Sequence, residues 1–567
     1  MLPPGIRNRL RYSECRRTQH VLSRVDARGE AAIANECRCC HCGNTRAGRR
    51  EWVVVDSADV VVIGAGHNGL VAAGYLAAAG LDVLVLEAGS SPGGNTITEE
   101  LTLPGFAHDS CSSAHVLIQS NPLLKDDELG LLSKYGLEYV LTDPAVAFPQ
   151  PDGDALVVHR DLDATADEIA RWSSHDAREF KSMIKEWTAG LAAVHGRWGS
   201  GLDLGDGEAA QRYRALREKS AWNVVHERFA DATVRTFVLW LAMATIQDPR
   251  RPGTGVLPSS LTSGRLSFGW ATPVGGSGAL PAALIQQLQA NGARVECSSP
   301  VDRIEFGSGR VTGVRTADGR RVHARKAVVS SAHLTKLPGM LDGITAPDGL
   351  IRARDSWQAG LSVFAVHAAL RGNLEFRSRS GPLLSAAAGF GAAAGALRQI
   401  DAFHRGEADA TDPWLLVVNQ TVVDKTRAPA GAGTFKILTI APYHRSDGRS
   451  WDNAKQVYAE KLVDLVRARA SGLDPDDILA LRADSPVDVA GHNPHNVGGS
   501  CHGGEFVLPS GRVVPAWSSH RTSLPGLFLT GATTHPGGSV SGRPGRNAAR
   551  TVLTDLGIDP GTVMGPT

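Results

Sequence analysis

Glycines and one glutamate between positions 59 and 87 have the types and the spacing that a dinucleotide site requires. Gly64 permits a tight turn, Gly66 lets a pyrophosphate approach the backbone, and Gly69 lets a following helix pack against the preceding strand. Glu87 can accept hydrogen bonds from the ribose hydroxyls of an adenosine. Together these residues predict that the chain binds a dinucleotide.

The elements that would position these residues follow in the required order. Val60 to Ile63 is an unbroken apolar run, which is typical of a buried parallel strand. A helix is expected from about Leu70 to Ala79 with a stop at Gly80, and a second apolar strand from Val83 to Leu86 leads into Glu87. In a chain with 63 glycines a GxGxxG pattern alone is weak. The complete strand, helix and strand favours a dinucleotide site over an ordinary glycine-rich turn.

A second strand, loop and helix lies near the end of the chain. Leu527 to Leu529 is an apolar strand that leads into Gly531, a glycine-rich loop and an alanine-rich helix ending near Leu556. Such an arrangement directs backbone N–H groups and a helix dipole toward a negative or electron-rich group. We therefore expect both ends of the chain to converge on one extended cofactor.

Between these motifs the sequence predicts a helical region and two groups of strands. Short strands at 301–306, 311–316 and 321–324 predict a β-meander, with 328–330 as a strand rejoining the first sheet. Strands at 361–370, 414–418 and 435–440 predict a second, antiparallel sheet. From 161 to 246, apolar residues at helical spacing indicate either a helical cap packed on its own core or the lining of an apolar substrate tunnel. These residues are Ile169, Trp172, Phe180, Ile184, Trp187, Trp222, Val225, Phe229, Phe237 and Trp240.

The composition is that of a globular protein with balanced charge. The chain has 567 residues, and 59 Lys+Arg against 58 Asp+Glu give a net charge of +1, so nothing suggests a nucleic-acid partner. No apolar run reaches the ~20 residues of a membrane-spanning helix. The sequence shows no signal peptide and predicts a cytoplasmic protein, with peripheral membrane contact through residues 161–246 as a further expectation.

Residues 1–55 differ from the rest of the chain. They are rich in Arg, contain no Lys and hold five of the eight cysteines, so we predict a disordered extension. The scattered cysteines of the remainder indicate a reducing compartment. A soft metal could in principle bind the cluster near position 40, but its spacing is poor for a tetrahedral site and we expect no metal. The cluster consists of Cys37, Cys39, Cys40, His41 and Cys42.

The motifs described so far resemble those of the phytoene desaturase-like FAD-dependent oxidoreductases, of the carotenoid desaturase and ketolase type, which are related to flavin amine oxidases. The resemblance extends from Asp59 to about Leu556. Its anchors are VVVIGAGHNGLVAA, the segment Glu87 to Gly94, PVGGSGAL from Pro273, and the closing GATTHPGGSVSGRPGRNAA. It implies FAD as the cofactor. By the same resemblance, the residues that contact FAD would be Gly64, Ala65, Gly66, Asn68, Gly69, Glu87, Ala88, Gly93, Gly94, Val301, Gly531, Gly538, Ser539 and Val540.

Three positions depart from patterns found in relatives of this kind. Asn95 follows the Gly-Gly pair where many relatives have Arg, which leaves phosphate neutralisation there open. Ala532 stands where amine oxidases usually have an acidic residue, and His-Pro-Gly follows from position 535, as in carotenoid-type desaturases. Ser539 stands where desaturases more often have Gly. The sequence is therefore similar to the desaturase and ketolase side of the family, and the substrate stays open.

The histidines near the C-terminal motif are the candidates for proton transfer. A flavin can accept a hydride from an activated C–H bond while the protein supplies orientation and a dry pocket, so no catalytic triad or carboxylate pair is required. His502 and His535 are the candidate catalytic residues, each as a general base. A hydrogen-bonded structural role is the alternative for either.

The expected fold class is α/β and α+β. It combines a discontinuous Rossmann-like FAD-binding domain of the glutathione reductase and amine oxidase kind with an antiparallel-sheet substrate domain and a helical cap. The FAD-binding domain is expected at 56–150, 271–345 and 501–557, the cap at 151–270, the substrate domain at 346–500 and a tail at 558–567.

The resemblance implies an FAD-dependent oxidoreductase that desaturates or otherwise oxidises a large apolar molecule by hydride transfer to flavin. The substrate would be an isoprenoid, a carotenoid-like compound or another secondary metabolite. The alternatives are a flavin amine oxidase, which Ala532 disfavours, and a non-enzymatic prenyl-protein-binding module of the Rab escort and GDI kind, which Glu87 disfavours.

A second dinucleotide site is not expected, and this bears on the electron acceptor. Gly389, Gly391 and Gly395 superficially resemble another fingerprint, but no strand is expected before them, and we predict an alanine- and glycine-rich surface loop. Enzymes that reduce flavin with NAD(P)H commonly carry two such folds. The oxidant is therefore expected to be oxygen, a quinone or another diffusible acceptor.

Overall fold

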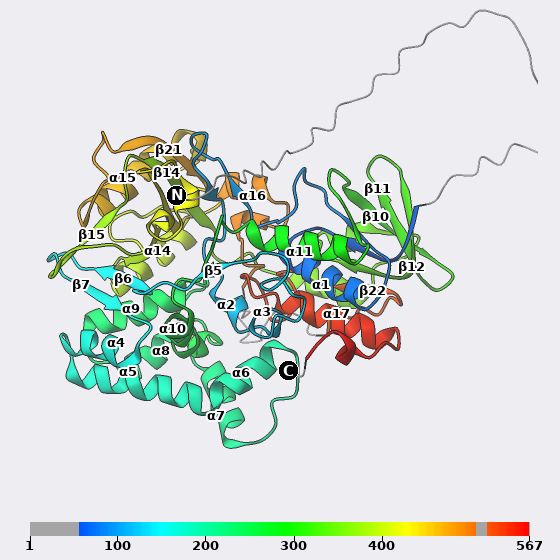
Figure 1. Ribbon diagram of the computed structural model, residues 1–567, viewed down its shortest axis with the longest axis horizontal. Coiled ribbons are helices and arrows are strands. Elements are labelled where there is room, and N and C mark those ends of the chain that lie inside the picture. Colours follow the sequence, from blue (N-terminus) through cyan, green and yellow to red (C-terminus); the bar gives the residue numbers. More distant parts are fainter. Residues whose placement is uncertain (1–55, 506–518, 566–567) are drawn as a thin grey trace, which may run out of the picture. The chain divides into compact units, whose positions relative to one another are not determined.

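The structure is a computed structural model that describes residues 56–505 and 519–565. The expected extension at 1–55, with its cysteine cluster, lies outside the described residues. Two large sheets and a group of helices make up the described part of the chain (Figure 1).

The first sheet combines strands from both ends of the described chain. It has eight strands in the order β13-β10-β11-β12-β1-β2-β9, with β22 also paired to β12. β1 is parallel to β2 and β12, and β22 is parallel to β12, so the carboxyl ends of β1, β12 and β22 lie at the same edge. The strands are β1 (Asp56–Ile63), β2 (Val83–Leu86), β9 (Arg294–Glu296), β10 (Val301–Gly307), β11 (Arg310–Thr316), β12 (Arg321–Ser330), β13 (Leu341–Asp342) and β22 (Leu527–Leu529).

Three helices cover one face of this sheet: α1 (His67–Ala78), α11 (Ala279–Ala290) and α17 (Arg543–Asp555). Their apolar side chains form one buried cluster with the strands, including Leu76, Leu284 and Val552. α17 approaches α1 closely because Gly545 has no side chain: a Cβ there would lie 2.4 Å from the carbonyl oxygen of Asn68. The C-terminal helix is thereby fixed beside the helix of the N-terminal motif.

The second sheet is mostly antiparallel and has seven strands in the order β21-β14-β19-β18-β17-β6-β7. Every residue of β14 is buried, which fits its almost wholly apolar sequence. α15 (Lys455–Arg467) packs on one face of the sheet. The strands are β6 (Val146–Pro149), β7 (Ala155–Val158), β14 (Val363–Leu370), β17 (Ala387–Phe390), β18 (Leu415–Val418), β19 (Gly433–Ile440) and β21 (Ile478–Asp484).

The helices α4 to α10, which follow β7 in the chain and precede β9 of the first sheet, form the cap. Asp161, Ser173 and Asp231 each accept a hydrogen bond from a first-turn N–H, so these side chains set the starts of α4, α5 and α9. Phe180 and Trp240 are buried in a cluster shared with the second sheet, so this part of the aromatic stripe is core. The helices are α4 (Leu162–Ala170), α5 (Ser174–Glu186), α6 (Ala192–Gly199), α7 (Glu208–Glu218), α8 (Ala221–Arg228), α9 (Ala232–Met243) and α10 (Leu257–Phe268).

Shorter elements connect these parts of the chain. The helices are α2 (Val116–Gln119), α3 (Pro122–Lys125), α12 (Leu337–Met340), α13 (Asp348–Ser356), α14 (Ala393–His404) and α16 (Pro486–His492). The strands are β3 (Thr98–Glu99), β4 (His108–Asp109), β5 (Tyr139–Val140), β8 (Thr272–Pro273), β15 (Glu375–Ser378), β16 (Gly381–Leu383) and β20 (Ala470–Ser471).

The predicted surface loop around Gly389 is wrong. Residues 387–390 form the buried strand β17, and α14 follows it. A Cβ at Gly389 would lie 2.5 Å from the ring of Trp240, so the glycine is needed where the indole packs on the strand. β17 pairs antiparallel with β18 rather than in a βαβ unit, so this strand and helix do not make a second dinucleotide fold.

Two strands expected at 321–324 and 328–330 are one continuous strand, β12. Arg325 and Lys326 interrupt the apolar run in the sequence, but their side chains reach the carboxylates of Asp59 and Asp82 instead of ending the strand. β6 and β7 lie on either side of the expected boundary at 150, and both belong to the second sheet. The domain boundaries stay predictions.

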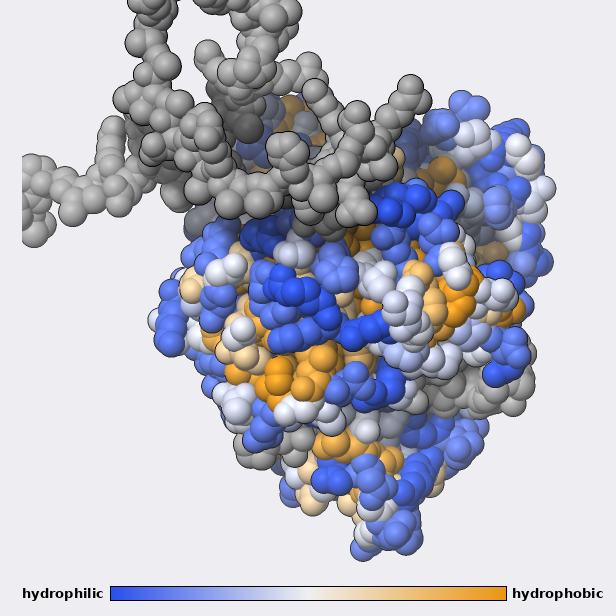
Figure 2. Space-filling view, turned by 90° about the vertical axis from the view of Figure 1, so that its right-hand side faces the viewer, coloured by the Kyte–Doolittle hydropathy of each residue, from blue (hydrophilic) through white to orange (hydrophobic). Residues whose placement is uncertain are grey.

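None of the described helices combines the length and apolar character needed to span a bilayer. On the face seen in Figure 2, hydrophobic side chains form small areas separated by hydrophilic ones.

Candidate active site

One cavity of about 400 Å³ joins the two glycine-rich motifs to apolar residues of the cap and the second sheet. The predicted residues that do not line it are Ala65, Gly93, Gly538 and His535. The predicted residues that line it are Gly64, Gly66, Asn68, Gly69, Glu87, Ala88, Gly94, Val301, His502, Gly531, Ser539 and Val540.

The glycines of the first motif leave the space that a pyrophosphate needs. Gly66 is the N-cap of α1, and a Cβ placed on it would meet no atom within 4 Å, so a side chain there would project into the cavity. Gly64 has a φ of 91°, and a Cβ on Gly69 would lie 2.1 Å from the carbonyl oxygen of Gly64. No side chain of the described residues caps α1, so its first-turn N–H groups and its dipole are available to an anion. The residues fit the phosphate groups of FAD.

Glu87 lines the same cavity at the end of β2. Its Oε2 accepts a hydrogen bond from the N–H of Ala65 at 2.6 Å, and its Oε1 accepts one from Gly89 at 2.7 Å. These bonds fix the carboxylate, and each oxygen keeps a lone pair for a further donor. Ala65 therefore positions Glu87, and the arrangement fits a ribose with two hydroxyl donors.

Replacing Glu87 by alanine is expected to weaken FAD binding by roughly 1 to 3 kcal/mol, because a charged acceptor for the ribose hydroxyls is removed. Glu87→Gln keeps one carbonyl acceptor, so its affinity for FAD should lie between the affinities of wild type and Glu87→Ala. The dissociation constant of FAD for the apoprotein measures the effect, and thermal unfolding of the apoproteins separates it from loss of the bonds to Ala65 and Gly89. Unchanged FAD affinity in Glu87→Ala would contradict this placement.

Asn95 takes part in an amide network instead of supplying a positive charge. Its Nδ2 donates to Asn496 Oδ1 at 2.8 Å, and its Oδ1 accepts from Asn493 Nδ2 at 2.8 Å. A Cβ on the neighbouring Gly94 would lie 3.2 Å from Cα of Gly66. Asn95 thus ties the Gly-Gly turn of the first motif to the segment before the second motif.

The closing glycine-rich loop approaches residues 501–503 closely. A Cβ on Gly538 would lie 2.2 Å from the carbonyl oxygen of His502, so only glycine fits this contact. Gly531 has a φ of 97° and Ser539 a φ of 77°. Asn121 Nδ2 also donates to the Ser541 carbonyl at 2.8 Å, which ties the loop to the N-terminal half.

The two candidate bases lie in different surroundings. His502 lines the cavity, its Nδ1 is 3.0 Å from Cys501 Sγ, and burial lowers its pKa to about 4, so the ring is neutral at pH 7. His535 donates from Nε2 to the carbonyl oxygen of Trp198 at 2.5 Å and packs against the Trp198 ring. His535 therefore contacts the cap, and only His502 of the two faces the cavity.

Three further histidines, His67, His333 and His495, line the cavity and were not among the predicted site residues. Burial lowers the pKa of His495 to about 4 and that of His333 to about 2, so both rings are neutral. Their ring centroids are 4.9 Å apart, and the Nε2 of each is buried with no hydrogen-bond partner among the described residues. His333 lies just after β12, and nothing in its sequence context marks it.

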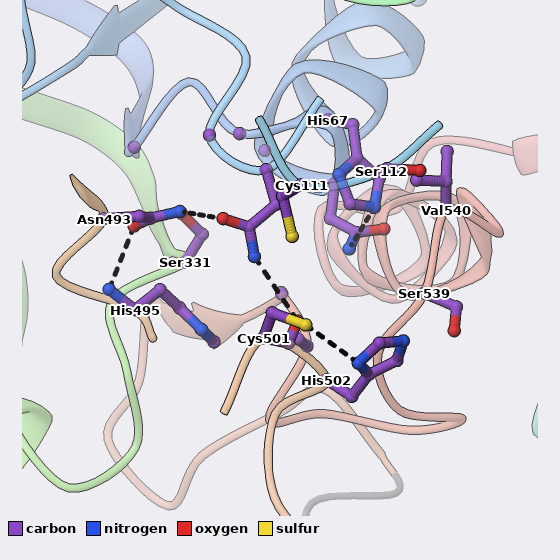
Figure 3. A pocket seen from close by; sticks show the side chains of 18 of the residues that line it. His67, Cys111, Ser112, Ser331, Asn493, His495, Cys501, His502, Ser539 and Val540 are labelled. Carbon is purple, nitrogen blue, oxygen red and sulfur yellow. Dashed lines mark hydrogen bonds between the residues drawn. The ribbon is translucent and has the colours of Figure 1, made fainter. Parts of the chain in front are cut away.

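Cys111, Cys501 and Lys436 lie together in the cavity wall, with both thiols in view in Figure 3. The thiols of Cys111 and Cys501 are hydrogen-bonded, and this bond lowers the pKa of Cys111 and raises that of Cys501. Lys436 Nζ donates to the carbonyl oxygens of Asp109 at 2.8 Å and Cys111 at 2.5 Å, and to Ser113 Oγ at 3.2 Å. Its donors are therefore occupied by the wall itself.

The rest of the lining is mostly apolar and comes from the cap, the second sheet and α2. Cap residues around α9 and α10 face strands β18 and β19 across this part of the cavity. The apolar lining residues are Val116, Leu117, Ala244, Leu261, Trp270, Leu416, Val418 and Leu438. The cavity thus has one part whose residues fit a nucleotide and one apolar part.

A parallel sheet with an uncapped helix N-terminus and an acidic residue after its second strand defines a dinucleotide-binding protein. Comparison with known proteins gives the family. The model of the family "Flavin containing amine oxidoreductase" matches residues 69–553, and the chain belongs to this family.

The chain is 28% identical to a limonene dehydrogenase polypeptide of Castellaniella defragrans, over 89% of this chain and 96% of the relative. It is 27% identical to hydroxyneurosporene desaturase of Cereibacter sphaeroides, over 88% of this chain and 98% of the relative. Its fold is similar to that of a double-mutant putrescine oxidase, with a TM-score of 0.60, 16% identity, and coverage of 89% and 100%.

These findings confirm the predicted fold class, the phytoene desaturase-like resemblance and FAD as the cofactor. The protein is an FAD-dependent oxidoreductase.

Proposed function

We propose that the protein oxidises a large apolar substrate, of the isoprenoid or polyene kind, by hydride transfer to FAD held in the cavity. The observation that carries the proposal is that the nucleotide-binding part and the apolar part belong to one cavity. FAD supplies the hydride acceptor. The names of the relatives, a limonene dehydrogenase and a hydroxyneurosporene desaturase, agree with substrates of this chemistry.

In this proposal the protein's own residues bind, orient and keep out water. The first motif and Glu87 hold the adenosine diphosphate part, and the loop from Gly531 to Val540 holds the part nearer the reacting ring. Apolar residues of α10, β18 and β19 hold the substrate and exclude water from the bond that is oxidised. In this proposal the neutral ring of His502 accepts the proton that the substrate loses. His535 holds the closing loop against the cap.

Amine oxidation is the competing enzymatic activity, because the name of the family refers to amine oxidoreductases. A cationic amine needs a negative or aromatic partner in the substrate half. Among the described residues that line the cavity, Glu87 is the only acidic one, and it lies at the nucleotide half. The ring of Trp270, an aromatic residue of the apolar part, already carries the Arg265 guanidinium, 4.2 Å from its centroid, so the lining favours an uncharged or anionic substrate.

A diffusible electron acceptor remains part of the proposal, as does contact with a membrane that carries the substrate. The strand and helix around Gly389 do not make a nicotinamide-binding fold. Large apolar side chains that are exposed among the described residues lie outside 161–246, so the cap surface gives no support to membrane contact there.

Anaerobic mixing of the FAD-loaded protein with single substrates tests the proposal. A terpene hydrocarbon such as limonene, or a linear polyene, is expected to bleach the oxidised flavin absorbance, and oxygen or a quinone should then restore it. Putrescine and NADPH serve as controls and should leave the flavin oxidised. Reduction by putrescine alone would establish the amine oxidase reading, and rapid reduction by NADPH would contradict the single-nucleotide arrangement.

A further inference from the structure

Arg265 of α10 is a buried cation in the apolar half of the cavity. Its side chain lines the cavity and the residue is only 8% exposed. The guanidinium lies over the ring of Trp270, 4.2 Å from the centroid. Trp270 belongs to an apolar cluster that also contains Leu416 and Val418 of β18, which line the same cavity. The charge therefore stands among the residues that would surround the substrate.

Within residues 56–505 and 519–565, no carboxylate forms an ion pair with Arg265. Its one hydrogen bond runs from Nη1 to the carbonyl oxygen of Gly269, and at 3.5 Å it is at the limit for such a bond. Burial lowers the pKa of Arg265 to about 9, with no neighbouring charge to offset it. A guanidinium needs charged or polar acceptors when it leaves water, because burial of an unpaired ion is costly.

The other buried cations of this region have a carboxylate or several oxygen atoms of the protein as partners. Arg427 is more deeply buried than Arg265, and its Nη2 is 2.8 Å from Asp109 Oδ2. Lys436 donates to backbone and side-chain oxygens of the cavity wall. Lys336, the third basic residue of the lining, is exposed to water. Among the basic residues that line the cavity, Arg265 is thus the buried one that has no carboxylate partner and only one weak hydrogen bond among the described residues.

We infer that Arg265 is a binding site for a carboxylate. The substrate would be an acid with a long apolar chain, and its carboxylate would pair with this guanidinium. The planar guanidinium matches a carboxylate with two parallel hydrogen bonds, and an apolar chain would lie against Leu261, Leu416 and Leu438. The carboxylate takes no part in the chemistry: the bonds broken are C–H bonds of the chain. This inference rests on the proposed function, in which the apolar half holds the substrate.

Binding of geranate and methyl geranate to the FAD-loaded protein, measured by calorimetry, tests the inference. The two probes share an isoprenoid chain and differ in the charge of the head group. The wild-type protein is expected to bind geranate roughly ten- to hundredfold more tightly than the ester, the range for hydrogen bonds to a charged group. Arg265→Met should remove this preference while keeping the affinity for the ester, and Arg265→Lys should keep part of it.

Arg160→Met is the matched control, because Arg160 is exposed and its Nη2 donates to the Ser267 carbonyl of α10 from outside the cavity. This variant should keep the wild-type preference for the acid. Equal binding of acid and ester to the wild-type protein would overturn the inference without any variant, and so would a preference retained in Arg265→Met.

The calorimetric result is independent of flavin reduction, which separates the two proposals. A protein that prefers geranate but is reduced by no apolar compound keeps the Arg265 site and loses the proposed function. A protein that is reduced by apolar compounds and binds acid and ester equally keeps the proposed function and loses the carboxylate site.

Discussion

Replacing Gly66 by valine is expected to lower FAD affinity by at least about a hundredfold while leaving the fold intact. The space next to Gly66 is empty of protein atoms and belongs to the cavity, so a branched side chain would occupy the place of the pyrophosphate rather than displace protein groups. The flavin absorbance per mole of purified protein and the FAD dissociation constant of the apoprotein measure the effect. Thermal unfolding of the two apoproteins should show nearly equal stability.

Gly207→Val is the matched control for this substitution. Gly207 is the N-cap of α7, with φ −64° and ψ 165° against −65° and 160° at Gly66, and it also has open space around it. Its side chain would point to solvent, so the FAD content should equal that of wild type. Wild-type FAD affinity in Gly66→Val would overturn the placement of the cofactor.

Replacing Arg427 by methionine is expected to cost about 3 to 5 kcal/mol of folding free energy, because it leaves the carboxylate of Asp109 buried without its partner. Arg427 Nη2 lies 2.8 Å from Asp109 Oδ2, and the same nitrogen donates to Gln420 Oε1 at 2.9 Å. Asp109 precedes the cavity-lining segment that begins at Cys111, so FAD content should fall with stability. Urea unfolding of the apoproteins gives the free energies.

Arg325→Met is the control, since Arg325 also contacts two carboxylates, Asp59 and Asp82, but at the surface. It should lose far less stability than Arg427→Met, because exposed ion pairs contribute little. Equal losses of folding free energy in the two variants would show that burial of the pair of Asp109 and Arg427 adds nothing to its contribution to stability.

The stability contributed by Asp109 depends on pH in a defined direction. Burial tends to raise the pKa of Asp109, but the charge and hydrogen bonds of Arg427, with those from Ser277 and Thr98, outweigh it and hold this pKa below its usual range. A lowered folded-state pKa stabilises the protein above the pKa of the unfolded group, about 3.9, and this contribution disappears as pH falls through the folded pKa. The difference in free energy of unfolding between wild type and Asp109→Asn should therefore become smaller below about pH 4.

The sequence predicted the elements whose signals are local. The run from Val60 to Glu87 specifies strand, turn, helix and strand by neighbouring residues, and the structure has β1, α1 and β2 there within a few positions. Most residues that the resemblance implied as FAD contacts line one cavity.

The features that the sequence did not predict depend on contacts between distant residues. Gly389 lies in a strand on which Trp240 packs, and a glycine that follows a run of alanines carries no local β signal. Cys111 meets Cys501, and Asp109 meets Arg427, only after both sheets have formed. Arg265 looks like an ordinary polar residue of a helix, and only the folded chain shows that no acidic residue of the described part pairs with it.

The position of β22 sets the order in which the cofactor site can form during synthesis. Its partner β12 and the motif at Gly64 to Gly69 are synthesised long before Leu527. The hydrogen bond from Asn121 to Ser541 also joins residues that are 420 positions apart, so it cannot form until the end of the chain has been made. Until that late segment arrives, the edge of β12 next to Val328 to Ser330 has no partner strand and the cavity lacks its closing loop. Nascent chains thus expose an unpaired strand edge, and tight capture of FAD is an event that follows translation rather than one that guides it.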